Sequence, residues 1–395
     1  MLLAGPWAGR SDGKMSNIEA MQRALTDVVS KGDFVVPPYP AVAMRLQRVL
    51  SRDNYAIAEI ADVVATDAPL AATVLAAANS AMLAGAAPIT SLSRAVNRLG
   101  ARTVGSIALA SGVGALATAT GVLHDVKFRV WRRGVTCALA CQKLAAASHL
   151  DPEEAFLAGL LHGFGRSVAV TSLERLLKTH QPPRPLAAAE WLNIAEQQRA
   201  VLAHAVAQRW QLPSSIAEAI DPGATVGASA LADLVVYADQ LAADLDAGRM
   251  PQARTPAEAP LIDALVSALP GTLEALAPQA SLRPSPTSPV LAKPERALSG
   301  ELRQKSLHVV DRRSKGAAEL KTIALTASGI QVESSRPFQE SSMVRLAVGE
   351  AAAPWELWFN VALCAATGAR YKVELELFSP TRETRDRWRA LFDAP

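Results

Sequence analysis

The stretch IAEIADVVATDAPLAATVLAAANSAML, residues 57–83, has the pattern of two consecutive helices. From Ile57 to Val64 its apolar residues recur at helical spacing and predict one buried stripe. Asp67 and Pro69 then predict the start of a second helix, because proline is well tolerated in the first helical turn. Two short helices in close succession favour a compact all-helical domain over a sheet.

Helical periodicity extends outward from this block over most of the chain, from Asn17 to about Leu245, with a further helical segment at 259–276. Within it the pattern predicts separate helices at 152–161 and 167–180 and one helix at 195–211. The stretch PQASLRPSPTSPVLAKPERALSG is rich in Pro and Ser and predicts a linker. The predicted domains are a flexible leader at 1–16, a helical domain at 17–277, a linker at 278–300 and a β-barrel at 301–395.

Beyond the linker the hydrophobic period changes from that of helices to that of strands. SLHVV, LKTIAL, GIQVES, MVRLAV, ELWFNVALC and YKVELELF each predict a strand. The tail TRETRDRWRALF predicts an amphipathic helix with Trp388, Leu391 and Phe392 facing inward. The expected fold is therefore a multidomain protein, in which an all-α domain precedes a small antiparallel β-barrel with a C-terminal helix.

Composition excludes several classes of protein. Half of the 395 residues are hydrophobic and 19% are charged, which excludes a wholly disordered chain. The formal net charge of +3 is too even for nucleic-acid binding by bulk charge. Three cysteines form no disulfide framework, and no convincing signal peptide begins the chain, so we expect a cytoplasmic protein. The uncharged stretch 104–123 is rich in small residues, and we interpret it as buried helices and not as a membrane span.

The order of several blocks resembles that of a known family. They are FVVPPYPAVAMRLQRVLS (34–51), the block at 57–83, APITSLSRAVNRLGARTVGSIALA (87–110), AFLAGLLHGFGRSV (155–168), and the closing pair QRWQLPSSIAEAI and YADQLA. From about Asp33 to Leu245 this order is similar to the HDOD family, non-catalytic relatives of HD-type metal phosphohydrolases found in bacterial signalling proteins. The resemblance implies a helical regulatory domain.

The same resemblance identifies where an HD enzyme would hold its metals. Such an enzyme needs histidines and carboxylates that converge on divalent ions. Here the His-Asp pair is replaced by His162 and Gly163, and the other expected histidine positions fall near Arg133 and Arg199. His162 and Asp239 alone cannot hold a catalytic metal, and cationic neighbours would repel one. We therefore predict no catalytic residues, no metal and no cofactor.

The C-terminal part resembles the PilZ family, barrels that often bind cyclic di-GMP through an R-x-x-x-R arm and a D/N-x-S-x-x-G motif. The second motif aligns with Ala324, Thr326 and Gly329, so the acidic or amide residue is missing. In the arm, Arg303 is followed four residues later by Leu307. The resemblance makes a candidate nucleotide site from Arg303, Arg312, Arg313, Thr326 and Gly329.

Three hypotheses about function follow from these observations. The first is a non-catalytic bacterial signalling protein that acts through contacts with protein partners. The second is a cyclic di-GMP receptor that uses the PilZ-like barrel, and the third is a divergent HD-type phosphohydrolase. The lost motif residues favour the first hypothesis, and the binding role itself rests on resemblance because a fold does not determine a function.

Overall fold

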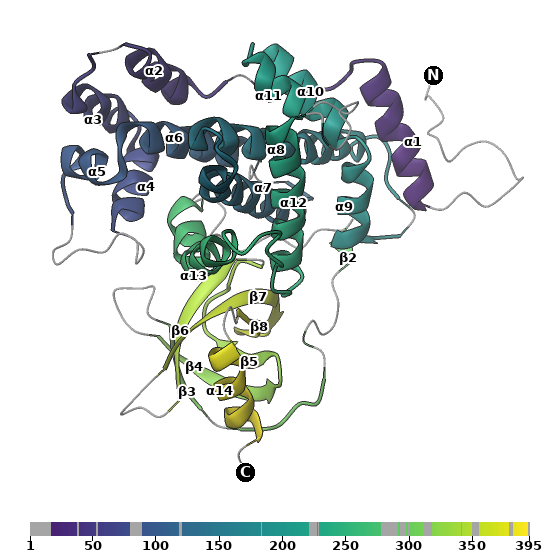
Figure 1. Cartoon of the computed structure of the whole chain (residues 1–395). Helices are drawn as coiled ribbons and strands as arrows, with labels where there is room; N and C mark the ends of the chain where they lie inside the picture. The colour runs from purple at the N-terminus through teal and green to yellow at the C-terminus, as the bar shows by residue number, and fades with distance from the viewer. Residues whose placement is uncertain are drawn as a thin grey trace, which may run out of the picture.

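The structure is a computed structural model, and it describes most of the chain between residues 17 and 393. The described residues are 17–37, 39–52, 54–79, 89–117, 121–182, 184–220, 227, 229–277, 291–292, 298, 300–305, 307–311, 318–340, 342–349, 355–378 and 382–393. The expected leader at 1–16 and most of the expected linker lie outside these residues. The described part contains a helical bundle and a β-barrel that lies beneath it (Figure 1).

The helical part confirms the predicted all-α domain. Its helices are α1 (Asn17–Ser30), α2 (Ala41–Leu50), α3 (Ile57–Ala65), α4 (Ala68–Ala78), α5 (Leu92–Leu99), α6 (Ala101–Ala117), α7 (His124–Ala145), η1 (Ala146–Ser148), α8 (Pro152–Leu176), α9 (Ala188–Glu196), α10 (Arg199–Arg209), α11 (Ser214–Ala219), α12 (Ala230–Asp246) and α13 (Ala259–Leu276). The predicted start of α4 is correct, since the Asp67 carboxylate accepts a hydrogen bond from the backbone N–H of Leu70 at 3.0 Å.

Two predicted helix boundaries are wrong. The segments expected as separate helices at 152–161 and 167–180 form one continuous helix, α8, because its interior glycines pack against neighbouring helices and do not break it. The helix expected at 195–211 is instead divided into α9 and α10, with the break at Gln197 and Gln198. Glu196 at the end of α9 and Arg199 at the start of α10 both face α8 across this break.

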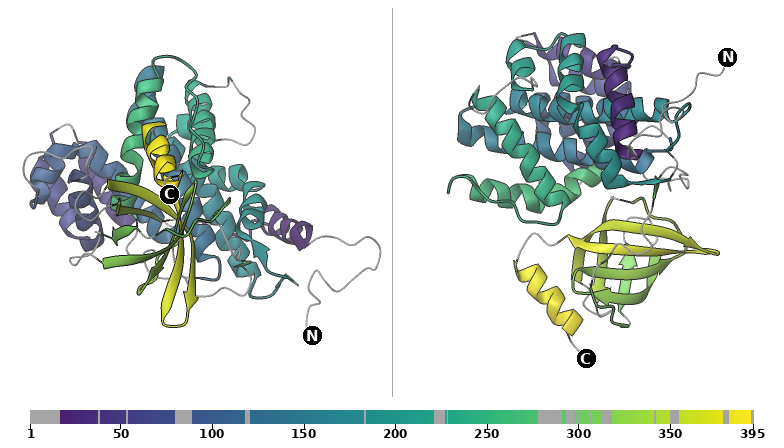
Figure 2. Two further views of the ribbon diagram at one scale, coloured as in Figure 1. Left: turned by 90° about the horizontal axis from the view of Figure 1, so that it is seen from below. Right: turned by 90° about the vertical axis from the view of Figure 1, so that its right-hand side faces the viewer.

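Helix α8 lies at the centre of the bundle (Figure 1), in contact with α6, α7, α10 and α12. The right-hand view of Figure 2 shows the helices above and the barrel with its terminal helix below. It is the one described helix that is long and apolar enough, by length and composition, to cross a membrane. Its apolar window is 89% buried inside the protein, so its apolar surface is already covered by other helices. These contacts are those of a core helix in a helical bundle.

The C-terminal part confirms the predicted antiparallel barrel with a terminal helix. Its strands are β3 (His308–Asp311), β4 (Ala318–Thr326), β5 (Gly329–Ser334), β6 (Met343–Gly349), β7 (Trp355–Thr367) and β8 (Arg370–Phe378), and the helix is α14 (Arg382–Asp393). The strands close in the order β3-β4-β5-β8-β7-β6. Trp388 and Phe392 of α14 are buried against the barrel core, as the sequence predicts.

The two parts are docked through a mixed apolar and polar contact. Met343 of β6 joins the hydrophobic core of the bundle, beside α13. Arg132 of α7 donates hydrogen bonds to Asn360 of β7 at 2.6 Å and to Asp246 of α12 at 2.7 Å. Gln339 of the barrel donates to the Asp125 carboxylate of α7 at 3.3 Å. Polar contacts of this kind are typical of domain interfaces that can separate.

A second connection comes from the segment expected as a linker. Its residues Leu291–Ala292 form β2, which pairs in parallel with β1 (Leu186–Ala187) of the helical part. Further along, Leu298 is buried, and its backbone N–H donates to the Glu374 carboxylate of β8 at 2.8 Å. The described residues between the two parts therefore touch both of them.

Candidate functional site

A cluster of charged side chains lies where the sequence analysis placed the degenerate metal site. Five helices contribute to it, and its members are Arg133 from α7, His162 and Arg166 from α8, Glu196 from α9, Arg199 from α10 and Asp239 from α12. The structure thus brings together both retained residues, His162 and Asp239, and both predicted arginine positions.

Asp239 is held by two arginines. Arg133 donates to its carboxylate at 3.2 and 2.8 Å, and Arg166 donates to the same two oxygens at 3.0 and 2.8 Å. Each arginine therefore makes a bidentate contact, the strongest arrangement for a guanidinium and a carboxylate. Both carboxylate oxygens of Asp239 are occupied by guanidinium groups.

The rest of the cluster joins Glu196 to His162. Arg166 donates to the Glu196 carboxylate at 2.5 Å through Nε, and Arg199 donates to it at 2.8 Å. Arg199 also lies 3.0 Å from Nδ1 of His162. A guanidinium can only donate hydrogen bonds, so Nδ1 must accept and the imidazole is neutral with its proton on Nε2. That Nε2 atom lies 3.8 Å from the Asp239 carboxylate.

Burial and neighbouring charges shift the pKa values in this cluster. Burial lowers the pKa of His162 below its ordinary 6.5, and the nearby arginines reinforce this against the opposing contact with Asp239. Burial alone would raise the pKa of Asp239, but contacts with His162 and Arg166 outweigh it and hold that pKa well below its usual range. At Glu196 too, contacts with Arg166 and Arg199 outweigh the effect of burial and lower the pKa of the carboxyl group. Both carboxylates are ionised at neutral pH, and His162 is uncharged.

These residues do not fit a divalent metal ion. The only carboxylates in the cluster, those of Asp239 and Glu196, accept from arginines, and the free imidazole nitrogen of His162 accepts from Arg199. An ion placed among them would lie beside three guanidinium groups. In the described part of the chain, no group of three or more His, Cys, Asp or Glu side chains is placed to hold a metal.

Gly163 stands where the family resemblance implies an acidic ligand, and the packing at this position leaves no room for a side chain. A Cβ atom at this position would lie 2.7 Å from the Cα atom of Gly134 in α7. This contact is between two backbones, so neither helix can make room by rotating a side chain. The close approach of α7 and α8 therefore requires a residue without a side chain at position 163.

Three residues of the candidate nucleotide site lie near one another in the barrel. Arg303 pairs through its backbone with Leu325 of β4, next to Thr326. Thr326 is fully buried, and its carbonyl accepts a hydrogen bond from the indole of Trp388 at 3.1 Å. A Cβ atom at Gly329 would lie 2.1 Å from the Leu375 carbonyl of β8, so strand packing explains this glycine.

Helix α14 covers this part of the barrel. The Arg303 guanidinium stacks on the ring of Phe392 at 4.4 Å and donates to the Phe392 carbonyl at 3.3 Å. Lys305 donates to the Leu391 carbonyl at 2.9 Å. The arm is thereby bound to the C-terminal turns of α14. The other two predicted residues, Arg312 and Arg313, lie outside the described residues.

The helical part matches a known protein family. The HDOD domain family matches residues 36–223, which contain α2 to α11. Residues 36–223 form an HDOD domain. This confirms the resemblance found in the sequence, and the HDOD domain supplies every member of the charged cluster except Asp239, which follows on α12. The closed barrel with its terminal helix is compatible with a PilZ-like domain.

Individual proteins similar to this chain include one relative by sequence and several solved structures. An uncharacterized protein of Treponema pallidum (strain Nichols) is 24% identical over 216 residues, which are 52% of this chain and 41% of that protein. A structure from Shewanella amazonensis SB2B, provisionally named a metal-dependent phosphohydrolase, is 23% identical and covers 67% of this chain and 95% of its own, with a TM-score of 0.48. An HDOD domain protein of unknown function from Geobacter sulfurreducens is 21% identical and covers 65% and 90%, with a TM-score of 0.43.

Sequence reasoning missed two members of the cluster. Arg166 follows His162 by four residues, so on a continuous helix both side chains lie on one face. The predicted break at 162–166 contained both residues and so concealed this spacing. Glu196 lies three residues before Arg199, but the predicted continuous helix at 195–211 gave no reason to direct both toward α8. In the HDOD domain these two residues complete the ion-pair network.

Proposed function

We propose that this protein is a non-catalytic regulatory protein that acts through contacts with protein partners in bacterial signalling. The observation that carries the proposal is the pairing of Asp239 with Arg133 and Arg166. Guanidinium groups supply the positive charge that buried carboxylates require. The helical domain is therefore held together without a metal, and its fold remains available as a rigid scaffold.

The engagement of the charged cluster's own side chains with one another supports the same proposal. An HD-type hydrolysis needs a metal-activated water and a cation to neutralise the phosphate. Here the arginines are engaged by carboxylates inside the protein, and His162 is used as a hydrogen-bond acceptor. The third hypothesis, a divergent phosphohydrolase, has no support from this arrangement.

Metal analysis of the purified full chain tests the non-catalytic part of the proposal. We expect no stoichiometric Fe, Mn or Zn after growth with added metals, and no hydrolysis of nucleotide phosphoesters. About one metal ion per chain that is lost in the H162A variant would contradict the proposal. Affinity capture from the native cell tests the partner, provided that the captured protein then binds the purified chain directly.

The cyclic di-GMP receptor is a second candidate, and one observation favours it. The arm residue Arg303 lies beside the β4 strand that carries Thr326, which is the arrangement that the PilZ resemblance requires. Against it, the Arg303 guanidinium is bound to α14, and Ala324 provides no acceptor for a guanine edge. We therefore expect no binding at low-micromolar cyclic di-GMP.

Isothermal titration of the full chain with cyclic di-GMP separates the two candidates. Two lost charge-assisted contacts, at Leu307 and Ala324, weaken affinity by at least about a hundredfold relative to an intact motif. Saturable low-micromolar binding that is abolished when Arg312 and Arg313 are changed to Ala would favour the receptor. An unchanged affinity in that variant would assign the binding to other residues.

A further inference from the structure

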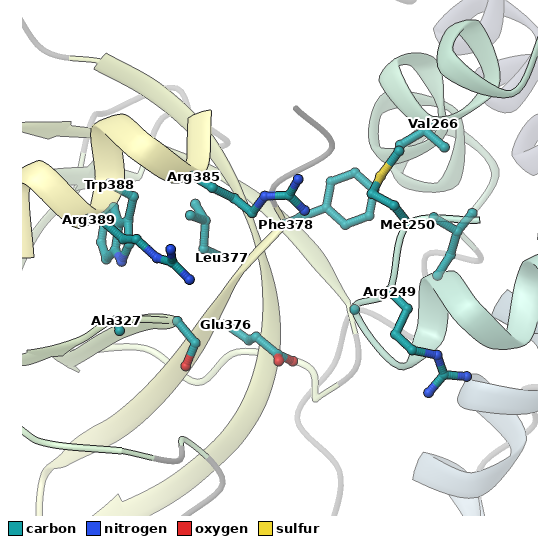
Figure 3. Close-up of a pocket in the computed structure, with 13 residues that line it drawn as sticks. Arg249, Met250, Val266, Ala327, Glu376, Leu377, Phe378, Arg385, Trp388 and Arg389 are labelled. Atoms are coloured by element: carbon teal, nitrogen blue, oxygen red, sulfur yellow. The ribbon is translucent and has the colours of Figure 1, made fainter. Parts of the chain in front are cut away.

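A cavity lies at the junction of the helical part, the barrel and α14. It has a volume of about 220 Å³, and it is lined by residues from all three regions: Leu245, Gly248, Arg249, Met250, Val266, Ala327, Ser328, Glu376, Leu377, Phe378, Arg385, Trp388 and Arg389 (Figure 3). A smaller cavity of about 40 Å³ adjoins it and reaches Arg132 and Asn360 at the domain contact. The charged cluster and the Arg303 side chain lie outside both cavities.

Two arginines of α14 face this cavity and have no bonding partner among the residues that the structure describes. Arg385 and Arg389 are one helical turn apart, so both side chains lie on one face. Figure 3 shows both extending from α14 toward the strand that carries Glu376 and Phe378. Among the described residues, neither arginine has a hydrogen bond or an ion pair, and both are exposed.

Neighbouring arginines on the same surface are already occupied. Arg249 lines the cavity, but its guanidinium binds the Asp244 carboxylate at 2.6 and 3.1 Å and points toward the helical part (Figure 3). Arg387, on another face of α14, stacks on the Trp355 ring at 4.4 Å. Arg385 and Arg389 therefore differ from these arginines in having free donors directed at a cavity.

The remaining walls restrict the ligand that these donors could bind. Two guanidinium groups offer two forked sets of donors, which match the three free oxygens of a phosphate monoester better than the two of a carboxylate. On the strand side, the Glu376 carboxylate can accept a hydrogen bond from a hydroxyl or amino group. Met250, Leu377 and Phe378 provide apolar contact between these polar ends.

We propose that this junction cavity binds a phosphate monoester of a small hydroxylated or aminated organic molecule. Arg385 and Arg389 bind the phosphate, and Glu376 accepts from the body of the ligand. The site goes beyond partner binding by the HDOD domain, and it uses none of the residues of the candidate nucleotide site. Because its walls belong to both parts of the chain, the bound ligand stabilises their docked arrangement.

Isothermal titration of the full chain with AMP, ribose 5-phosphate and phenyl phosphate tests the proposal. We expect saturable binding of at least one of the three, and no binding of adenosine, which lacks the phosphate. The double variant R385A/R389A should weaken that binding by at least about a hundredfold, since two charge-assisted contacts are lost. The matched control R345A/R387A removes the same charge from arginines that stack on barrel tryptophans, and it should leave binding unchanged.

The variant E376Q sharpens the assignment of the opposite wall. It should weaken the binding of ribose 5-phosphate and leave phenyl phosphate unaffected, because only the sugar offers hydroxyl donors. Circular dichroism of every variant controls for folding. No binding of any phosphate probe at millimolar concentration, equal binding of adenosine and AMP, or equal losses in R385A/R389A and in its control would each overturn the proposal.

Discussion

The arginines of the charged cluster and those of α14 are the same residue type in opposite situations. Arg166 is buried and donates to both Asp239 and Glu196, whereas Arg385 and Arg389 face a cavity with no partner among the described residues. In the first place the guanidinium is the counter-charge of the largely buried Asp239 and the half-buried Glu196. In the second place the guanidinium groups are left free to bind something from outside the chain.

This difference shows that the role of an arginine depends on what its guanidinium group contacts. A buried carboxylate engages the donors that face it, and removing one of those donors is destabilising because the buried charge is left uncompensated. An arginine whose guanidinium contacts no carboxylate keeps its donors available for a ligand. Changes to the two groups should therefore have separate consequences, on folding for the cluster and on binding for α14.

The largest effect should follow from R166M. This change keeps the aliphatic volume and removes the charge that Asp239 and Glu196 share, so we expect a loss of about 4 kcal/mol in the free energy of unfolding. Urea denaturation of the full chain measures it. R385M serves as the control and should cost about 0.5 kcal/mol or less. Equal losses in both variants would remove the distinction between the two groups of arginines.

A smaller loss should follow from G163A. The added Cβ meets the Gly134 backbone at 2.7 Å, and we expect a cost of about 2 kcal/mol from this overpacking. The matched control is G271A in α13, where a Cβ would meet nothing within 4 Å. That variant should be neutral or stabilised by up to about 1 kcal/mol, because alanine favours helices over glycine. A neutral G163A would show that α7 and α8 are not fixed at this contact.

The pH dependence of stability should report the neutral state of His162. The pKa of His162 is lower in the folded chain than its ordinary 6.5, so below pH 6.5 the unfolded chain binds the extra proton first. Stability should therefore fall as the pH drops from 6.5 toward the folded pKa, at up to about 1.4 kcal/mol per pH unit. Urea denaturation at several pH values measures the slope, and H162Q should flatten it above pH 5. An identical slope in H162Q would assign the effect to other groups.

Cleavage of the linker should have the smallest effect on folding. We expect limited proteolysis to cut first within 278–300 and to leave two folded fragments. The fragments should still elute together from a sizing column, because Arg132 and Met343 hold the docked contact. R132A should separate them, while R370A, on the far hairpin, should not. A linker as resistant as the domains would contradict the proposed boundary.

The fold could be predicted from the sequence wherever the pattern is local. The strands of the barrel, the start of α4 at Asp67 and the inward face of α14 all follow from periodicity and capping. The boundaries of α8 could not be predicted, since two glycines close together, Gly163 and Gly165, usually indicate a break in a helix. Their true role depends on Gly134 and Arg199, which approach from distant parts of the chain.

The candidate site was predictable in location and not in content. The HDOD resemblance placed His162 and Asp239 together and identified Arg133 and Arg199 as cationic residues at positions where an HD enzyme has histidines. Arg166 and Glu196 escaped notice because their role depends on the path of α8 and on the break after α9. The junction cavity has no sequence signature, since its walls come from four segments separated along the chain, at 245–250, 266, 327–328 and 376–389.

The backbone contact between Gly163 and Gly134 also constrains how this protein could evolve. Restoring the acidic ligand by a single substitution would place a side chain where another backbone already lies. A return to metal chemistry would first require α7 and α8 to move apart, which would disturb the core packed between them. A single substitution at position 163 is therefore not enough to place an acidic side chain in the charged cluster, because the backbone of Gly134 would have to move as well.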